Sequence, residues 1–242
     1  MQIKLPSKVS IIIPIHNEEG VLENQLSLIN EGIKSVVKNF EIILVENESK
    51  DKSKEIIIEF AREKPEIIPV IFPYADYGGA LREGIIKSSG EIVHICQIDF
   101  FHLSFFQNSL TKLDDETPFI IASRNRFGWD NRPLQRKILT FGLNFLLKVF
   151  FGFKGTDTHG LKTFYRKSVI GFVKECRMRR GMFDTEFTLR SQYSGLNILE
   201  MPVKAFEIRA KRNTYFQKIF RNIIDLIVMK RIFIKEKKNA TK

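Results

Sequence analysis

The sequence predicts an α/β fold in which a mainly parallel central sheet carries helices on both faces. Short apolar runs typical of buried parallel strands occur at residues 9–13, 41–45 and 68–72. Each run is followed by a segment whose apolar side chains recur at helical spacing. Strands and helices that alternate in this way assemble into parallel βαβ units.

The first strand shows how the elements are delimited. Pro14 follows the apolar run and is expected to halt the strand. Asn17, Glu18 and Glu19 are suited to cap and charge the N-terminus of the helix that comes next. The first three predicted helices cover residues 18–38, residues 52–64 and a segment that begins near residue 79.

Polar residues follow the strands at the points where they end. The strand at residues 41–45 leads into the polar run 46–51, and the strand at residues 92–98 ends on Asp99. Because the carboxyl ends of parallel strands meet at one edge of an open sheet, we expect these carboxylates at a ligand-binding edge. Later elements follow a less regular pattern, with helices at 104–113, 133–151, 166–176 and 184–194, a polar run at 156–162, and strands at 119–123 and 198–207.

Composition is typical of one compact domain. The 242 residues are 43% hydrophobic and contain no low-complexity linker, so we expect one domain over residues 1–212 and a basic amphipathic helix and tail over residues 213–242. Cys96 and Cys176 lie far apart in sequence, which predicts reduced thiols in a cytoplasmic protein. Only a short segment, Met1 to Pro6, is available before the first strand, so we expect no signal peptide.

The net positive charge indicates an anionic partner. Lys and Arg total 39 against 28 acids, a net charge of +11, with the excess at residues 124–137 and 204–242. No helix-turn-helix, zinc-ligand spacing or aromatic RNA-binding pattern accompanies it, which argues against nucleic acid. The longest apolar stretch, residues 138–153, is shorter than the ~20 residues of a spanning helix. An anionic membrane surface or anionic substrates therefore fit best.

The C-terminal segment has one apolar helical face. Apolar side chains recur on this face over residues 215–234, with lysines and arginines around it. We interpret it as an interfacial helix that holds the protein peripherally at the inner face of the cell membrane. Packing onto its own domain, onto a second copy or onto a membrane-protein partner is the alternative, and residues 235–242 are alternatively a solvated tail.

Seven short runs carry a family resemblance. They are residues 9–19, 45–53, 76–84, Asp99, 123–124, 157–162 and 183–186, and the resemblance that they carry covers about residues 7–212. In order and spacing they resemble the motifs of family 2 glycosyltransferases, in the branch similar to polyprenyl-phosphate sugar (dolichol-phosphate mannose) synthases. The resemblance implies a Rossmann-like GT-A fold. It also implies inverting transfer of a hexose from a UDP- or GDP-sugar to a polyprenyl phosphate, as in the synthesis of cell-envelope glycans.

The resemblance implies that the first half binds the nucleotide. The family usually has two aspartates and a glycine where this chain has Glu46, Asn47 and Glu48, and a glutamate keeps the acceptor for a base N–H. A solvated turn is the alternative for this cluster. The full set of nucleotide-binding candidates is Pro14, Asn17, Glu18, Glu46, Asn47, Asp76, Tyr77, Gly78 and Gln97.

Asp99 is the implied metal ligand. The family generally places Asp-x-Asp here to bind Mg²⁺ or Mn²⁺ on the nucleotide phosphates, but this chain has Gln97 in the first position. One carboxylate with phosphate oxygens and waters is still usual for Mg²⁺. His102 is a second candidate ligand, with a structural histidine as the alternative. The missing aspartate also raises a non-catalytic nucleotide-sugar-binding protein as an alternative function.

The second half is the implied acceptor side. Arg124 follows a strand, and Arg136 and Thr140 lie one turn apart at the start of an apolar helix, as phosphate contacts do in this branch. Cations at a helix N-terminus oppose its dipole, so a bound anion would relieve that conflict. For Arg126, Arg132 and Lys137, solvated cations are the alternative.

The resemblance places further sugar and acceptor contacts after residue 156. They are Asp157, His159, Gly160, Lys162, Asp184, Glu186 and Arg209, with Asp99, Asp157, Arg124 and Arg136 as the catalytic set. Asp184 alternatively caps a helix. His159 would be a base for a hydroxyl acceptor, whereas a phosphate acceptor needs no strong base. A glycosyltransferase acting on a glycan or another hydroxyl acceptor therefore stays open as an alternative.

Overall fold

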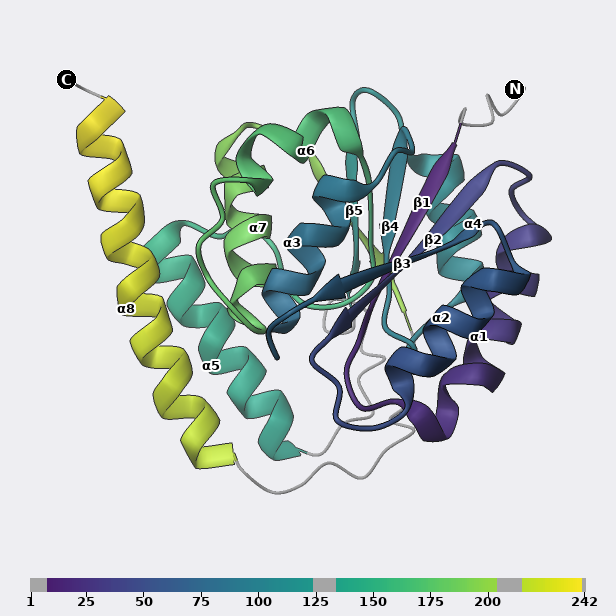
Figure 1. Ribbon diagram of the computed structural model, residues 1–242. Coiled ribbons are helices and arrows are strands. Elements are labelled where there is room, and N and C mark those ends of the chain that lie inside the picture. Colours follow the sequence, from purple (N-terminus) through teal and green to yellow (C-terminus); the bar gives the residue numbers. More distant parts are fainter. Residues whose placement is uncertain (1–7, 124–133, 204–214, 241–242) are drawn as a thin grey trace.

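A computed structural model describes residues 8–123, 134–203 and 215–240 of the chain (Figure 1). Its centre is a seven-stranded sheet with the order β3-β2-β1-β4-β6-β5-β7. The strands are β1 (Val9–Ile15), β2 (Phe40–Asn47), β3 (Ile67–Phe72), β4 (Ile92–Ile95), β5 (Phe119–Ser123), β6 (Lys162–Tyr165) and β7 (Ile198–Pro202). The helices are α1 (Glu19–Lys34), α2 (Ser53–Glu63), α3 (Tyr77–Lys87), α4 (Leu103–Lys112), α5 (Leu134–Phe151), α6 (Arg166–Val173), α7 (Met182–Tyr193) and α8 (Tyr215–Ala240).

The first half is the parallel part of the sheet. β1 pairs with β2 and β4, and β2 pairs with β3, all in parallel. Pro14 does not halt β1, which continues to Ile15, so that expectation was wrong. The Ile12 carbonyl still accepts from the Cys96 amide toward β4, but pairing with β4 ends at Ile12. Pro14 is the next residue whose backbone faces β4. Because the pairing with β4 has already ended there, the missing N–H of Pro14 costs no hydrogen bond of the sheet.

The second half departs from the parallel pattern at β6. This strand lies between β4 and β5 and is antiparallel to both, whereas β5 and β7 are parallel. The sequence did not predict β6, because its four residues mix polar and apolar types while Lys162, Thr163 and Phe164 are all buried. The strand directly follows the polar run that starts at Thr156 and so fixes that run beside the end of β4.

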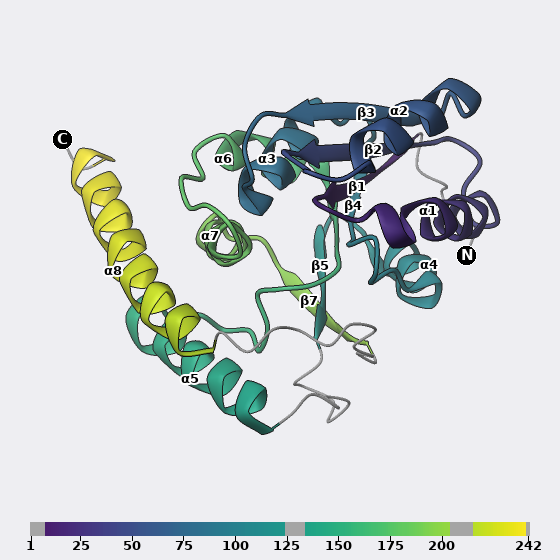
Figure 2. The same ribbon diagram turned by 60° about the horizontal axis from the view of Figure 1, so that its bottom comes forward.

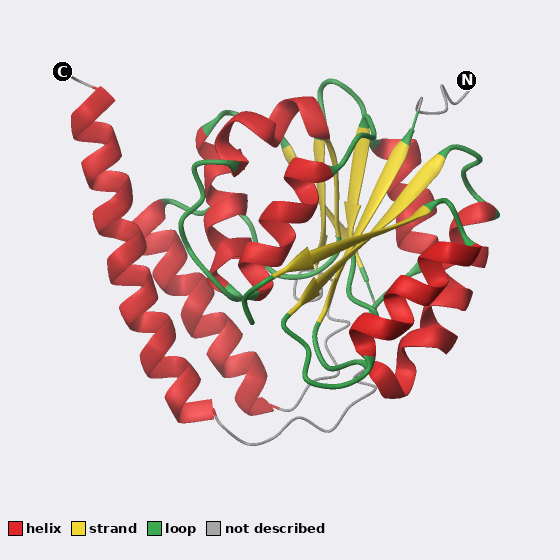
Figure 3. Ribbon diagram, in the orientation of Figure 1, coloured by secondary structure: helices red, strands yellow, loops and turns green. Residues whose placement is uncertain are grey.

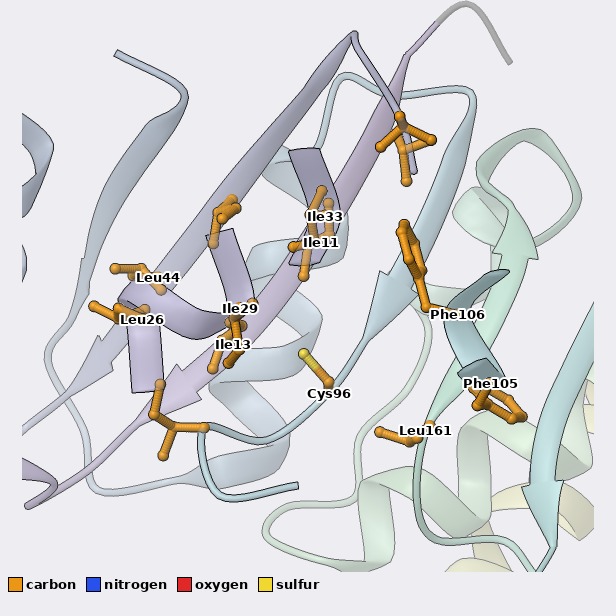
Figure 4. Packing of buried hydrophobic residues seen from close by; sticks show 14 of the residues in the cluster. Ile11, Ile13, Leu26, Ile29, Ile33, Leu44, Cys96, Phe105, Phe106 and Leu161 are labelled. Carbon is orange, nitrogen blue, oxygen red and sulfur yellow. The ribbon is translucent and has the colours of Figure 1, made fainter. Parts of the chain in front are cut away.

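Helices cover both faces of the sheet, as predicted (Figure 3). One face is packed by a cluster that includes Ile11, Leu26, Leu44 and Phe106 from β1, α1, β2 and α4 (Figure 4). The other face packs against α3, α6 and α7. A third cluster joins α5, α7 and α8, and the helices α5 and α8 lie side by side at one flank of the molecule (Figures 1 and 2).

Two predicted boundaries shift at places that matter for the site. β4 ends at Ile95 rather than at residue 98, because Gln97 forms an isolated bridge with Phe100. α7 begins at Met182 with Gly181 as its N-cap residue, so Asp184 lies inside the first turn and is not the cap. The first shift leaves Gln97 outside the strand, and the second places Asp184 in the first turn of α7.

Candidate functional site

The loops after β1 and β2 interlock at the carboxyl edge of the sheet. The Asn17 side-chain oxygen accepts from the Lys50 amide at 2.7 Å, and the Ser49 hydroxyl accepts from the Asn17 amide at 3.1 Å. Glu19 accepts from the Lys52 amide at 2.9 Å. Side chains of each segment thus bond amides of the other, and the N-cap side chains of α1 and α2 cap neither helix. This reciprocal bonding fixes the shape of the edge.

The predicted base acceptor is part of the second loop. Glu46 is buried, and its Oε1 accepts from the Ser49 amide at 2.5 Å. Asn47 is also buried, and its carbonyl bonds the His16 ring at 2.8 Å. Glu48 has a left-handed φ of 60° and accepts from the Ala75 amide at 2.8 Å. Glu46 and Asn47 are therefore built into the fold, whereas Glu48 is exposed to solvent.

Asp76 joins the start of α3 to the segment before α7. Its Oδ1 accepts from the Arg180 amide at 2.7 Å, and its Oδ2 accepts from Arg179 Nε at 2.7 Å. Burial alone would raise the pKa of Asp76, but these two hydrogen bonds outweigh it and lower the pKa. No role was predicted for Arg179 or Arg180, whose one signal in the sequence is their place in a short basic run.

Gly78 is required by the same contact. A Cβ at Gly78 would lie 2.5 Å from the Phe183 Cβ and 2.7 Å from the Arg180 carbonyl oxygen. The glycine therefore lets α3 approach the segment before α7, which a larger residue would prevent. Its predicted approach to the nucleotide stays a prediction.

A polar group of four side chains, of which two are fully buried and two partly buried, lies behind this edge. Lys162 Nζ and Asp184 Oδ1 are 2.5 Å apart, with side chains 0% and 2% exposed. Burial and the Asp184 carboxylate raise the pKa of Tyr77 well above its ordinary value. Gln97 Nε2 donates to the Tyr77 hydroxyl at 3.4 Å. β6, α7, α3 and the end of β4 thus meet at one polar centre.

Asp99 lies on a tight turn beyond that centre. The Phe100 amide donates to the Gln97 carbonyl at 3.0 Å, and Asp99 lies between them, partly exposed. In the described part of the chain no hydrogen bond or ion pair engages its carboxylate, and no group of three or more His, Cys, Asp or Glu side chains could hold a metal. Burial lowers the pKa of His102, whose ring packs 4.9 Å from the Phe100 ring.

The polar run before β6 folds back onto α7. The Asp157 side chain is buried and accepts from the His159 amide at 2.9 Å. The Thr158 hydroxyl bonds His159 Nδ1 at 3.0 Å and the Thr185 hydroxyl at 3.1 Å. Gly160 has a φ of 123°, a conformation that favours glycine. Lys162 donates to the Gly160 carbonyl at 3.3 Å, which ties the run to the buried ion pair.

Glu186 has a different role from the predicted sugar contact. Its carboxylate is fully buried, and Oε2 accepts from the amides of Arg177 and Met178 at 2.7 and 2.6 Å. Oε1 accepts from Arg190 Nε at 2.9 Å. Because protein donors engage both oxygens in a closed environment, Glu186 fixes the segment before α7.

The acceptor-side candidates meet this run through α5. Asn144 donates from its side chain to the Thr156 carbonyl, which identifies the face of α5 that meets the run. Thr140, partly buried, and Arg136 lie one and two turns earlier on that face. The side chain of Arg136 lies outside the described residues, as do Arg124, Arg126, Arg132 and Arg209.

Glu200 of β7 completes this contact. It accepts from the Thr156 amide at 2.5 Å and from the Thr156 hydroxyl at 2.7 Å. The sequence missed both Asn144 and Glu200, since neither lies in a recognisable motif.

The fold and this polar edge define the class of open α/β proteins that bind a ligand where the carboxyl ends of their strands meet. A family model described as Glycosyl transferase family 2 matches residues 10–172, and the chain belongs to this family. The predicted GT-A fold and family are thereby confirmed.

Three relatives differ in how much of them the chain covers. Dolichyl-phosphate beta-glucosyltransferase ALG5A of Trichomonas vaginalis is 30% identical over 83% of this chain and 66% of its own length. An undecaprenyl-phosphate 4-deoxy-4-formamido-L-arabinose transferase of Photorhabdus laumondii is 26% identical over 71% of this chain and 53% of its own. An uncharacterized protein of Methanocaldococcus jannaschii is 26% identical over 92% of both chains. The chain thus spans just under two thirds of the first of these relatives.

A solved structure shares the fold. It is glucosyl-3-phosphoglycerate synthase from Mycobacterium tuberculosis in complex with Mn²⁺, UDP and glucosyl-3-phosphoglycerate. The TM-score is 0.65 at 16% identity, covering 92% of this chain and 79% of that one. At this identity the likeness establishes the fold alone.

Proposed function

We propose that this protein is an inverting glycosyltransferase that moves a hexose from a UDP- or GDP-sugar to a polyprenyl phosphate. Two of the relatives are named for transfer involving dolichyl or undecaprenyl phosphate, and the solved neighbour was crystallised with UDP. The observation that carries the proposal is the contact of Asn144 with Thr156. Thr140 and Arg136 precede Asn144 by one and two helical turns, which supports a place for them beside this polar run.

Asp99 is the proposed ligand of Mg²⁺ or Mn²⁺. Its partly exposed carboxylate has no partner among the described residues, and one carboxylate is a usual protein share for Mg²⁺. A divalent ion there supplies positive charge to the leaving diphosphate. Gln97 contributes no charge, and its amide nitrogen is engaged with Tyr77. The donor set therefore fits an ion held mainly by phosphate oxygens and water.

The proposed reaction needs positioning more than acid–base chemistry. An acceptor phosphate oxygen forms a bond to the anomeric carbon, and the bond from that carbon to the diphosphate breaks, with its electron pair leaving on the diphosphate. The acceptor is already anionic, so no strong base is required. His159 Nδ1 is engaged with the Thr158 hydroxyl, in keeping with a positioning role. Arg124, Arg136 and Thr140 are the proposed phosphate contacts, and Asp157 borders the sugar.

The outer faces of α5 and α8 support peripheral attachment to a membrane. On α5, Phe141 is 74% exposed, Phe145 58% and Val149 61%, at a spacing that puts all three on one face. On α8, the large apolar side chains that are 41–49% exposed are Ile223, Ile224, Ile227, Val228 and Ile234. Exposed cations that accompany them include Lys148, Arg221, Arg231 and Lys235.

An apolar surface bordered by cations suits the inner, anionic face of a cell membrane. Phe141 and Phe145 directly follow Thr140 and Asn144, so the face proposed to meet lipid borders the face that meets the site. None of the helices, within the ranges that the structure describes, is long and apolar enough to span a bilayer.

Turnover with a defined acceptor tests the proposal. Purified protein, a panel of UDP- and GDP-sugars, Mg²⁺ or Mn²⁺ and polyprenyl phosphate should release nucleoside diphosphate only when the lipid phosphate is present. Asp99→Asn should abolish this release, whereas Asp115→Asn, at a side chain 88% exposed and remote from the site, should not. Faster transfer to a water-soluble alcohol would favour the hydroxyl-acceptor alternative. Binding without turnover under all conditions would favour the non-catalytic one.

Sedimentation with liposomes tests the membrane surface separately. Phe141→Ser with Phe145→Ser should reduce binding to anionic liposomes several-fold, since it removes apolar area from the proposed contact. Leu28→Ser is the matched control, because Leu28 is 56% exposed on α1, away from α5 and α8. Added salt should weaken binding of the wild type, and equal loss in both variants would contradict the assigned surface.

A further inference from the structure

Residues 177–180, just before α7, form a cationic turn with a fixed backbone. Arg177, Arg179 and Arg180 are exposed, while Met178 between them is buried. The Arg177 and Met178 amides donate to the buried Glu186, and the Arg180 amide donates to the buried Asp76. Two carboxylates from different elements thus hold the backbone on which three neighbouring cations repel one another.

The conformation of this turn is strained as well as fixed. Arg180 has a left-handed φ of 55°, which is uncommon and unfavourable for a residue with a side chain. Such strain persists only where the surroundings enforce it. Here Asp76 bonds the Arg180 amide, and Gly78 leaves room for the Arg180 carbonyl. The surrounding structure therefore stabilises an arrangement that the local sequence disfavours.

Arg179 is oriented by its own ion pair. Its Nε donates to Asp76 at 2.7 Å, although the side chain is 67% exposed. The guanidinium group has further N–H donors on its terminal nitrogens, in a planar arrangement that suits two phosphate oxygens. Holding the group through Nε removes much of its rotational freedom and leaves the exposed end available to an anion.

A chain of contacts connects this guanidinium to the proposed donor site. Asp76 is followed directly by Tyr77, whose hydroxyl meets Gln97, and Gln97 stands two residues before Asp99. The N-terminus of α3, which favours anions, begins at Tyr77. Arg179 thus stands beside the start of α3, while Met178 of the same turn packs in the cluster that joins α5, α7 and α8.

We propose that Arg179 contacts the diphosphate of the bound nucleotide sugar, and that Asp76, Glu186 and Arg190 are positioning residues for it. This inference rests on the proposed donor class. The leaving diphosphate gains negative charge when the bond to the sugar breaks. With Gln97 in place of a second carboxylate, fewer protein ligands hold the metal ion there. An oriented arginine supplies charge at that point without relying on the metal.

Arg190 acts through Glu186. Its Nη2 lies 2.8 Å from Glu186, which is also on α7, and 3.0 Å from Glu236 on α8. The Arg190 side chain is only 8% exposed. Removing its charge would leave the Glu186 carboxylate without its cation, and the turn would lose its fixed geometry.

Calorimetric titration with UDP and GDP, and with the corresponding nucleosides, tests the inference in the absence of any sugar acceptor. Arg179→Ala should weaken binding of the preferred nucleoside diphosphate about 10- to 100-fold, as expected for a charge-assisted phosphate contact. Binding of the nucleoside, which lacks the diphosphate, should change less than about twofold. The diphosphate affinity of Arg179→Lys should fall between those of the wild type and Arg179→Ala, because lysine keeps the charge but not the planar pair of N–H donors.

Arg177→Ala is the matched control. It removes the same charge from the same turn, and its guanidinium lies 3.9 Å from Glu236, away from Asp76. This variant should keep diphosphate affinity within about twofold, since a screened surface charge contributes little. Glu186→Gln should weaken diphosphate binding and leave nucleoside binding unchanged, as a positioning role requires.

Two results would overturn the inference. One is diphosphate binding by Arg179→Ala equal to that of the wild type; the other is equal weakening in Arg177→Ala and Arg179→Ala, which would indicate general attraction by the basic turn. The proposed function fails differently. If diphosphate binding depends on Arg179 but no sugar reaches polyprenyl phosphate, the inference stands and the acceptor assignment falls.

Discussion

The two halves of this protein hold their buried charges in different ways. In the first half, a carboxylate such as Glu41 receives several hydrogen bonds, from Lys8, Ser10 and Ser89, and one of these partners is itself 33% exposed. In the second half, Lys162 and Asp184 form a direct ion pair that is almost wholly enclosed. Glu41 is therefore held by several partners, whereas the charge of Asp184 is balanced mainly by Lys162.

The largest effect is expected from a substitution that breaks the enclosed ion pair. Lys162→Met removes the cation and leaves Asp184 charged and buried, which should destabilise the fold by about 3–5 kcal/mol. The free energy of unfolding, measured in urea by circular dichroism, checks this. The pair bridges β6 and α7, so the loss should also disturb the polar run that precedes β6.

Lys8→Met is the control from the first half. Lys8 bonds Glu41 at 2.6 Å, but Ser10 and Ser89 bond the same carboxylate, so its removal should cost less than about 1 kcal/mol. Similar destabilisation by Lys8→Met and Lys162→Met would remove the contrast between the halves.

The pH dependence of the free energy of unfolding tests the contribution of Glu41. Burial would raise the pKa of Glu41, but the hydrogen bonds from Lys8, Ser10 and Ser89 lower it from 4.5 to about 2. A carboxyl whose pKa is depressed by folding stabilises the protein above its unfolded pKa and loses that effect as the pH falls. Up to about 3 kcal/mol of stability should therefore disappear between about pH 4.5 and pH 2.

Glu41→Gln separates this group from the other carboxylates. The variant should be less stable than the wild type at neutral pH, and the difference should shrink in the acid range as the wild-type carboxyl becomes protonated. Urea unfolding at each pH measures both curves. A difference that does not depend on pH would mean that the charge of Glu41 plays no part.

The same contrast explains what the sequence could predict. β2 and the loop after it were predicted because apolar periodicity and a polar run are local patterns, and the strand is found at Phe40–Asn47. β6 was missed because its Lys162 is buried only through the distant Asp184. Both residues were named as candidates, but their pairing is a property of the tertiary fold.

The residues of the proposed donor site could be predicted more completely than those of the proposed acceptor site. Motifs marked Asp76, Tyr77 and Asp99 as candidates on the donor side, where the structure brings them to one edge of the sheet. Arg179 lies in no motif, and its contact with Asp76 becomes known only from the folded structure. Asn144 likewise becomes informative only once its hydrogen bond to residue 156 is known.

A smaller effect is expected where the halves meet. Gly78→Ala puts a Cβ against the Phe183 Cβ and the Arg180 carbonyl, so backbone has to shift. Overpacking of this kind costs about 1–3 kcal/mol, offset by up to about 1 kcal/mol because alanine favours the helix. Thermal unfolding should show a net loss. Unchanged stability with unchanged nucleotide binding would show that the two segments separate easily.

The smallest effect has the opposite sign and belongs to the second half. Gly142, inside α5, has nothing within 4 Å of an added Cβ, and its backbone does not adopt a left-handed φ. Gly142→Ala restricts the unfolded chain without a clash, which should stabilise the protein by about 0.4–1 kcal/mol and raise the melting temperature by about 1–4 °C. The same change of residue thus lowers stability in α3 and raises it in α5, because only α3 is pressed against the opposite half. Destabilisation by Gly142→Ala would mean that this face of α5 is more closely packed than its contacts indicate, and the contrast between the two helices would then fail.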